Sequence, residues 1–109
     1  MEKNVQIGIL LDIYGKLLTE KQKKLLEDYY NNDLSLSEIA ENENITRQAV
    51  RDNLKKGENN LFEYEQKLQL MNKNIKIKEK IQSILTEIEK IENKEKIMQN
   101  IKKQLKSLI

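Results

Sequence analysis

The chain has 109 residues, 35% charged and 38% hydrophobic, with no proline, three glycines and a formal net charge of +2, a composition that favours helices throughout. Cysteine and histidine are absent, which excludes disulfides, thiolate and imidazole catalysis and the usual zinc sites. Because Gln6, Asp12 and Lys16 interrupt the first apolar segment, we expect a cytoplasmic protein without a signal peptide or membrane span.

An amphipathic helix is expected over residues 4–18. Its apolar side chains recur at spacings of three, four and three on one face: Ile7, Leu10, Tyr14 and Leu17. Gly8 and Gly15 each weaken this helix by roughly 1 kcal/mol relative to alanine, and they permit close packing of a neighbouring segment.

Thr19 is expected to cap a second helix, since Gln22 stands three residues later, as in a capping box. The core-facing side chains of this helix are Leu25, Leu26 and Tyr29. Clustered turn formers at residues 31–33 end it. The pair Tyr29 and Tyr30 has the chemistry to stack on bases of single-stranded RNA. Core packing is the favoured interpretation for Tyr29, because it falls on the same face as the leucines.

A helix-turn-helix is predicted over residues 35–56. Ser35 and Glu38 have the spacing of a capping box, which starts a short helix with a small apolar face. Asn44 stands where the turn needs left-handed backbone, a conformation that asparagine tolerates at little cost. Glu43 occupies a position that is commonly apolar, and we expect it to be exposed.

The second helix of this motif, the recognition helix, is capped by Thr46 and buries Val50 and Leu54 on one face. The candidate nucleic-acid-binding residues lie off that face: Thr46, Arg47, Gln48, Arg51 and Lys55. Of twenty basic residues only Arg47 and Arg51 are arginines, and their planar, bidentate donors suit guanine edges and phosphates. Two helices joined by a turn of this kind are typical of a DNA-binding helix-turn-helix.

Ion pairing is the alternative role for the two arginines, Arg47 with Glu43 and Arg51 with Asp52. The segment 34–56 carries four basic and four acidic residues and is neutral. Because counterion release supplies most nucleic-acid affinity, a neutral motif predicts weak binding or a need for a partner.

Beyond residue 56 the sequence becomes rich in lysine, isoleucine and glutamate. The recognition helix is expected to run on to about Asn72, with Gly57 as the place for a bend or break and residues 72–74 as a pause. A seam of isoleucines at alternating spacings of four and three follows: Ile77, Ile81, Ile84, Ile88 and Ile91. A second seam is out of phase with the first: Met98, Ile101, Leu105 and Leu108.

We interpret residues 92–95 as a hairpin turn between these seams, with a continuous helix containing a stammer as the alternative. Isoleucine at both core positions indicates association of helices, and we expect a homodimer. Residues 73–109 also hold ten lysines against five acids. At helical spacing these lysines mostly line the polar side of the seam, and a nucleic-acid surface is the alternative.

The chain is therefore divided into a helical domain over residues 1–72, containing the helix-turn-helix, and amphipathic helices over residues 73–109 for dimerisation or docking. Carboxylates are abundant, but no nucleophile, matched base or glycine-rich phosphate loop accompanies them. An enzyme is not expected, and neither is a cofactor or a metal.

The segment from Leu17 to Leu68 resembles the YlxM-like helix-turn-helix proteins of low-GC bacteria, which are similar to region 4 of bacterial sigma factors. The matching elements are LT-x-KQ, YY, D-x-SL-x-EIAE, RQAV-x-DN-x-K and YE-x-KL. The resemblance implies an all-α fold, a sigma region 4-like helix-turn-helix bundle with a C-terminal helical extension or helical hairpin.

The resemblance also implies a regulatory role linked to the signal recognition particle pathway. The ligand would be DNA or the particle's RNA, bound through the recognition helix. The alternative is an adaptor that docks on the particle's GTPase, with the sigma-like module not reading DNA.

Overall fold

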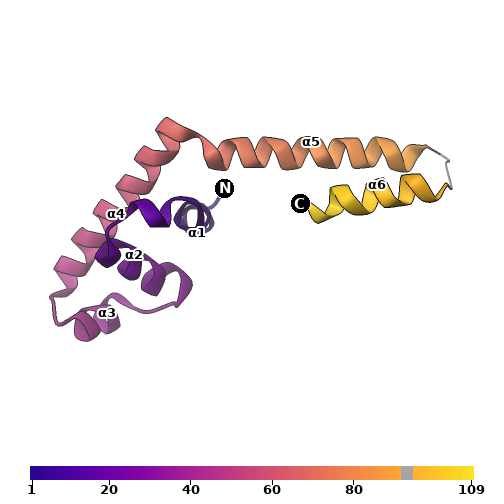
Figure 1. Cartoon of the computed structure of the whole chain (residues 1–109). Coiled ribbons are helices and arrows are strands. Elements are labelled where there is room, and N and C mark those ends of the chain that lie inside the picture. Colours follow the sequence, from indigo (N-terminus) through magenta and orange to yellow (C-terminus); the bar gives the residue numbers. More distant parts are fainter. Residues whose placement is uncertain (92–94) are drawn as a thin grey trace. The chain divides into compact units, whose positions relative to one another are not determined.

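The computed structural model describes residues 1–91 and 95–109, and Figure 1 labels its helices in chain order. These are α1 (Lys3–Tyr14), the 3₁₀ turn η1 (Gly15–Leu17), α2 (Glu20–Leu26), the π-helical turn η2 (Glu27–Asn31), α3 (Leu36–Glu43), α4 (Arg47–Leu68), α5 (Leu70–Lys90) and α6 (Lys96–Ser107). The described residues contain no strand, so the all-α prediction is confirmed. They divide into two compact units, Met1–Met71 and Asn72–Ile109. None of the described helices is long and apolar enough to cross a membrane.

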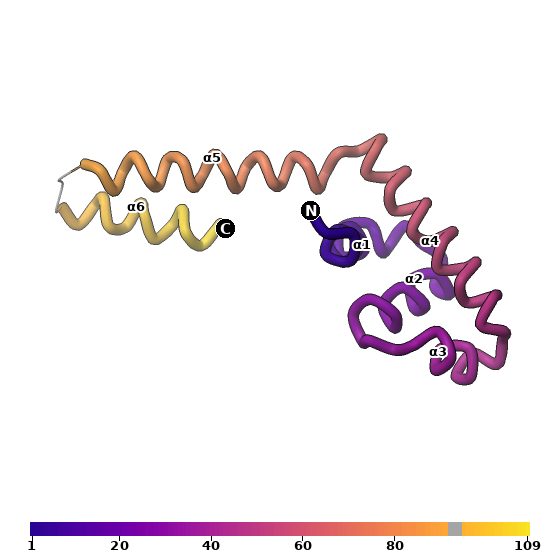
Figure 2. Tube along the Cα trace, turned by 180° about the vertical axis from the view of Figure 1, so that it is seen from behind, coloured from indigo at the N-terminus to yellow at the C-terminus, as the bar shows by residue number. Residues whose placement is uncertain are grey.

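The core of the first unit forms where α4 packs along α1, α2 and α3 (Figure 2). Its fully buried side chains come from all four helices: Ile7, Leu10, Tyr14, Leu25, Leu26, Ile39, Val50 and Leu61. The predicted face of the first helix is therefore confirmed at three of its four positions. The fourth, Leu17, is 53% exposed, because the chain tightens into η1 and rotates this side chain off the face. Leu11 is buried instead.

The second helix begins as predicted, with the Gln22 N–H donating to Thr19 Oγ1 at 3.1 Å. After Leu26 the helix widens into η2, and a π turn contains more residues than an α turn, so the following side chains leave the α-helical register. Tyr29 is consequently 36% exposed, and the prediction that it belongs to the core is wrong. Its neighbour Tyr30 is half-buried.

A single helix of 22 residues, α4, spans about 33 Å at 1.5 Å per residue. No break occurs at Gly57, which lies inside α4. A Cβ atom there would lie 2.8 Å from Leu26 Cδ1, so this glycine lets α2 approach the α4 backbone closely. The helix ends at Leu68, followed by Gln69 with a left-handed φ of 58°. The predicted pause at 72–74 is also wrong, because those residues lie inside α5.

A buried hydrogen-bond network closes the end of α4. The Tyr14 hydroxyl donates to Glu65 Oε1 at 2.7 Å, and the same carboxylate oxygen accepts the Met71 N–H at 3.0 Å. The Leu70 N–H donates to the Tyr14 hydroxyl oxygen at 3.1 Å. Burial raises the pKa of Tyr14, and the hydrogen bond to Glu65 raises it further. The network thus ties α1 to the first residues of α5.

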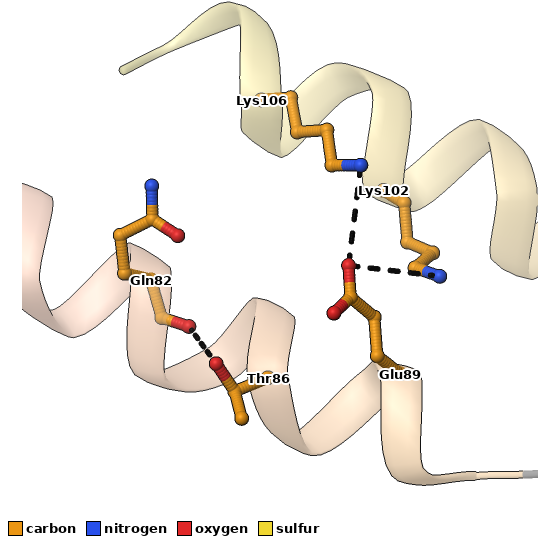
Figure 3. Close-up of polar contacts among 5 residues, drawn as sticks. All are labelled: Gln82, Thr86, Glu89, Lys102 and Lys106. Carbon is orange, nitrogen blue, oxygen red and sulfur yellow. Dashed lines mark hydrogen bonds and ion pairs between the residues drawn. The ribbon is translucent and has the colours of Figure 1, made fainter.

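In the second unit α5 and α6 run antiparallel, with Glu89 Oε1 3.9 Å from both Lys102 Nζ and Lys106 Nζ (Figure 3). The most buried apolar side chain of this unit is Leu85, at 3% exposure, and it was not among the residues of the predicted seam. The predicted hairpin turn at 92–95 includes residues 92–94, which lie outside the described residues.

The isoleucine seam of α5 divides into two faces. Ile81 and Ile88 flank Leu85 and are half-buried. The other seam residues, Ile77, Ile84 and Ile91, are 56%, 39% and 56% exposed. In α6, similarly, Met98 and Leu105 are half-buried whereas Ile101 and Leu108 are 38% and 66% exposed. Some residues of the predicted seam are thus partly buried within the chain, and the others are exposed at its surface.

Candidate nucleic-acid interface

The first helix of the helix-turn-helix, α3, starts with the predicted capping box. The Glu38 N–H donates to Ser35 Oγ at 3.1 Å, and the Ser35 N–H donates to Glu38 Oε1 at the same distance. Two backbone donors that the first turn leaves without carbonyl partners are thereby satisfied.

The turn after α3 is held by its backbone. Asn44 has the predicted left-handed conformation, with φ 55° and ψ 45°. The Ile45 N–H donates to the Ala40 carbonyl at 3.0 Å, and the Asn44 N–H donates to the Glu41 carbonyl at 3.3 Å. This pair of bonds is a Schellman motif, which closes the C-terminus of a helix and fixes the direction in which the chain leaves it.

Glu43, at the end of α3, is only 23% exposed in its side chain, so the prediction that it would be exposed is wrong. Lys24 of α2 reaches it, with Nζ 2.8 Å from Glu43 Oε1. Pairing with this carboxylate raises the pKa of Lys24. Glu43 therefore forms an ion pair with Lys24 of α2 and not with Arg47.

The recognition helix, α4, begins as predicted at Thr46, whose Oγ1 accepts the Ala49 N–H at 3.0 Å. Val50 is fully buried and Leu54 is 4% exposed, so they fix which face of α4 points inward. Asn53 is half-buried and donates from Nδ2 to the Ala49 carbonyl at 2.9 Å. Leu54 thus provides the core contact at this turn of the helix.

All five candidate binding residues lie on the exposed part of this motif: Thr46, Arg47, Gln48, Arg51 and Lys55. Arg47, Arg51 and Lys55 are spaced by four along α4, which aligns them on one stripe of the helix. Gln48 lies beside this stripe, and its Nε2 donates to Asp52 Oδ1 at 2.9 Å.

Neither arginine forms an ion pair with any residue in the described parts of the chain. The two carboxylates considered as partners are used elsewhere, since Glu43 pairs with Lys24 and Asp52 accepts from Gln48. The guanidinium groups of Arg47 and Arg51 therefore keep their donors available to a ligand.

A cavity of about 280 Å³ adjoins the cationic stripe. Its walls come from the start of α1, from η2, from the start of α3 and from α4: Lys3, Tyr29, Tyr30, Leu36, Arg51, Leu54, Lys55 and Glu58. Burial raises the pKa of Tyr30, and the nearby Glu58 carboxylate adds to the effect. Sequence reasoning missed Lys3 and Leu36 and assigned Tyr29 to the core, because neither the fold of α1 onto this face nor the π turn leaves a local signal.

No cluster of three or more histidine, cysteine, aspartate or glutamate side chains suited to a metal ion occurs among residues 1–91 and 95–109. The chemistry of this face is instead that of cations, amides, hydroxyls and aromatic rings. Such groups bind anionic and aromatic ligands.

Known proteins resemble this chain over most of its length. The profile of UPF0122, described as "Putative helix-turn-helix protein, YlxM / p13 like", matches residues 1–106. A UPF0122 protein of Fusobacterium nucleatum is 46% identical over 101 residues, covering 93% of this chain and 97% of the relative. One of Clostridium kluyveri is 48% identical over 91 residues, covering 84% and 82%. One of Malacoplasma penetrans is 54% identical over 66 residues, covering 61% and 62%.

Proposed function

The chain belongs to the UPF0122 family of YlxM- and p13-like helix-turn-helix proteins, and from this premise we propose that it is a non-enzymatic regulator that binds nucleic acid through its recognition helix. The ligand is DNA or the RNA of the signal recognition particle, the pathway that the resemblance to YlxM-like proteins implies. Arg47, Arg51 and Lys55 supply the cations of the interface. Thr46 and Gln48 supply its neutral polar groups.

One observation carries this proposal: the only two arginines of the chain are exposed on one stripe of α4 and have no ion-pair partner among the described residues. Burying Val50 and Leu54 turns that stripe outward, and the Thr46 cap and the Schellman turn fix its position. A guanidinium held on a rigid element can bind a phosphate or a guanine edge through two parallel hydrogen bonds.

The charge balance of the motif limits its affinity. Residues 34–56 are neutral, so few counterions are released when the motif alone meets a phosphate backbone. Gln48 must also exchange its hydrogen bond to Asp52 for one to the ligand. We therefore expect weak binding by one protomer and tighter binding by an assembly that presents two recognition helices.

A titration with three labelled ligands tests the proposal: duplex DNA, signal recognition particle RNA and the purified GTPase of the particle, each followed by fluorescence anisotropy. The double variant Arg47→Ala/Arg51→Ala is expected to bind nucleic acid more weakly than wild type. Lys16→Ala/Lys67→Ala is the matched control, because it removes the same charge from exposed positions outside the helix-turn-helix, in η1 and in the last turn of α4. Equal binding by wild type and the arginine variant would refute the role of the recognition helix.

The exposed isoleucines of α5 favour a second function, association with another protein. Ile77 and Ile84 of α5 and Ile91, directly after its last residue, are spaced by seven and all are at least 39% exposed, which places them along one side of the helix. A column with this period is covered best by a helix of the same period, and a second copy of the chain supplies one. We therefore propose a homodimer.

Light scattering tests the dimer, and Ile77→Lys/Ile84→Lys is expected to convert it to a monomer while α5 stays helical. A wild-type monomer at micromolar concentration would refute the dimer. The adaptor function would be supported instead if wild type bound the GTPase, bound neither nucleic acid, and lost the GTPase on Ile77→Lys/Ile84→Lys but not on Arg47→Ala/Arg51→Ala.

A further inference from the structure

The cavity beside the recognition helix combines two kinds of wall. One is aromatic and is formed by Tyr29 and Tyr30 of η2; the other is cationic and includes Arg51 and Lys55 of α4. Every lining residue belongs to the first compact unit, so the walls are held by one core. The cavity measures about 280 Å³, just below the usual range of small-molecule sites, roughly 300–1,000 Å³.

The aromatic wall is fixed in place. The Tyr29 and Tyr30 rings meet edge to face, with centroids 5.0 Å apart and planes at 86°. Glu58 of α4 lines the same cavity as Tyr30. Glu58 in turn lies 3.0 Å from Lys3 Nζ of α1. The ring of Tyr30 thus packs against the more exposed ring of Tyr29, and the ion pair joins the α1 and α4 sides of the cavity.

The cationic wall carries more positive than negative charge. Lys3 is paired with Glu58, the one carboxylate among the described residues that line the cavity. Arg51 and Lys55 have no ion-pair partner among the described residues, which leaves two positive charges directed at a ligand. An aromatic ring opposite an arginine and a lysine suits a planar apolar group joined to an anion.

A nucleotide has this composition, and we propose that the cavity binds one unpaired nucleobase by stacking on Tyr29 while Arg51 and Lys55 hold its phosphate. The volume suits one nucleotide rather than a run of them. A base within a duplex has both faces covered by its neighbours, so only an unpaired base can offer a face to Tyr29.

This inference rests on the proposed nucleic-acid function and makes it more specific. Arg47 lies on the same helical stripe but does not line the cavity, whereas Arg51 and Lys55 do. A paired segment against Arg47 and an adjacent unpaired nucleotide in the cavity would use the whole stripe. The preferred ligand is thus a helix with an unpaired nucleotide at its end or within it.

The experiment compares four labelled duplexes, each of two annealed strands, by anisotropy: a fully paired RNA stem, the same stem with one unpaired nucleotide, the same stem with an abasic unit at that place, and the DNA version of the second. The unpaired base is expected to tighten binding by roughly 5- to 100-fold over the paired and abasic stems. The RNA and DNA versions distinguish the two sources of such a nucleotide.

Variants of the cavity separate its parts. Tyr29→Ala is expected to abolish the preference for the unpaired base and to leave binding of the paired stem unchanged. Tyr29→Phe keeps a stacking ring and is expected to keep the preference. Lys55→Ala should weaken binding, whereas Lys56→Ala, one residue further on α4 and outside the cavity, should not. Far-ultraviolet circular dichroism establishes that each variant is folded.

The outcomes are distinguishable. Equal binding of the paired, abasic and unpaired stems by wild type, or an unchanged preference in Tyr29→Ala, would overturn the cavity proposal and leave the proposed function standing. Absence of binding to every stem would overturn both.

Discussion

Replacing Tyr14 by phenylalanine removes one oxygen atom from the junction between α4 and α5. That oxygen donates to the Glu65 carboxylate at 2.7 Å and accepts the Leu70 N–H at 3.1 Å. Tyr14 is 1% exposed, so water cannot replace either bond without opening the junction. The ring itself is retained, and no cavity larger than a hydroxyl group is created.

The expected loss of unfolding free energy is about 2 kcal/mol. A hydrogen bond to a charged group contributes about 1.5–3 kcal/mol, and the Leu70 N–H also loses its acceptor. Burial of the Tyr14 hydroxyl offsets part of this value, because phenylalanine is cheaper to bury than tyrosine. For a unit of this size the loss corresponds to a fall in Tm of about 8–16 °C.

Urea unfolding followed by tyrosine fluorescence measures this loss in the first unit alone, since every tyrosine lies within Met1–Met71 and the chain has no tryptophan. Tyr64→Phe is the matched control. Its hydroxyl also makes a long-range bond, to the Leu17 carbonyl at 3.1 Å, but at an exposed position, so we expect a loss below about 0.5 kcal/mol. A Tyr14→Phe loss no larger than that of Tyr64→Phe would refute the role of the network.

Three further expectations concern stability and are checked by the same urea titration. Gly57→Val should lower the free energy of unfolding by about 2–3 kcal/mol, because the added side chain overpacks against Leu26. Gly8→Ala, with nothing within 4 Å of its Cβ, should raise it by up to about 1 kcal/mol. Equal effects of the two variants would contradict the close approach of α2 to α4. Asn44→Ala should cost about 1 kcal/mol because of its left-handed backbone, and Asn44→Gly should cost less; a neutral alanine variant would contradict this. Burial raises the pKa of Tyr14 and Tyr30 above the ordinary 10.0, so the unfolded state loses these protons at lower pH than the folded state does. The free energy of unfolding should therefore fall as the pH rises above 10.0, and it should fall less steeply in Tyr30→Phe. A free energy of unfolding that stays constant above this pH would contradict the burial of the two hydroxyls.

The helix-turn-helix could be predicted in detail because its determinants are local. The Ser35 box, the Asn44 turn and the Thr46 cap each depend on side chains within a few residues of the backbone groups they satisfy. The exposed positions of Arg47 and Arg51 followed from the apolar spacing of the same helix.

Other features depend on changes of helical register that leave no periodic signal. The 3₁₀ turn moves Leu17 out of the core, and the π turn moves Tyr29 to the surface. An α-helical projection places both residues on the buried face. The helices could therefore be predicted correctly, whereas these two side chains were wrongly assigned to the core.

The remaining features depend on contacts between distant residues. Gly57 is needed because Leu26 packs against it, and Tyr14 meets Glu65 across 51 positions of sequence. Glu65 carries a weak signal, a charged residue four positions after the buried Leu61 on the same face. The cavity wall at Lys3 carries none, since only the folded unit brings α1 to α4.

The salt dependence of binding tests the central claim most directly. Each phosphate contact contributes about 0.9 to the slope of log affinity against log salt on duplex DNA, so Arg47→Ala/Arg51→Ala should reduce the magnitude of that slope by about 1.8. The control Lys16→Ala/Lys67→Ala should keep the wild-type slope. If the arginine variant instead showed the affinity and the slope of wild type, the recognition helix would not be the nucleic-acid interface.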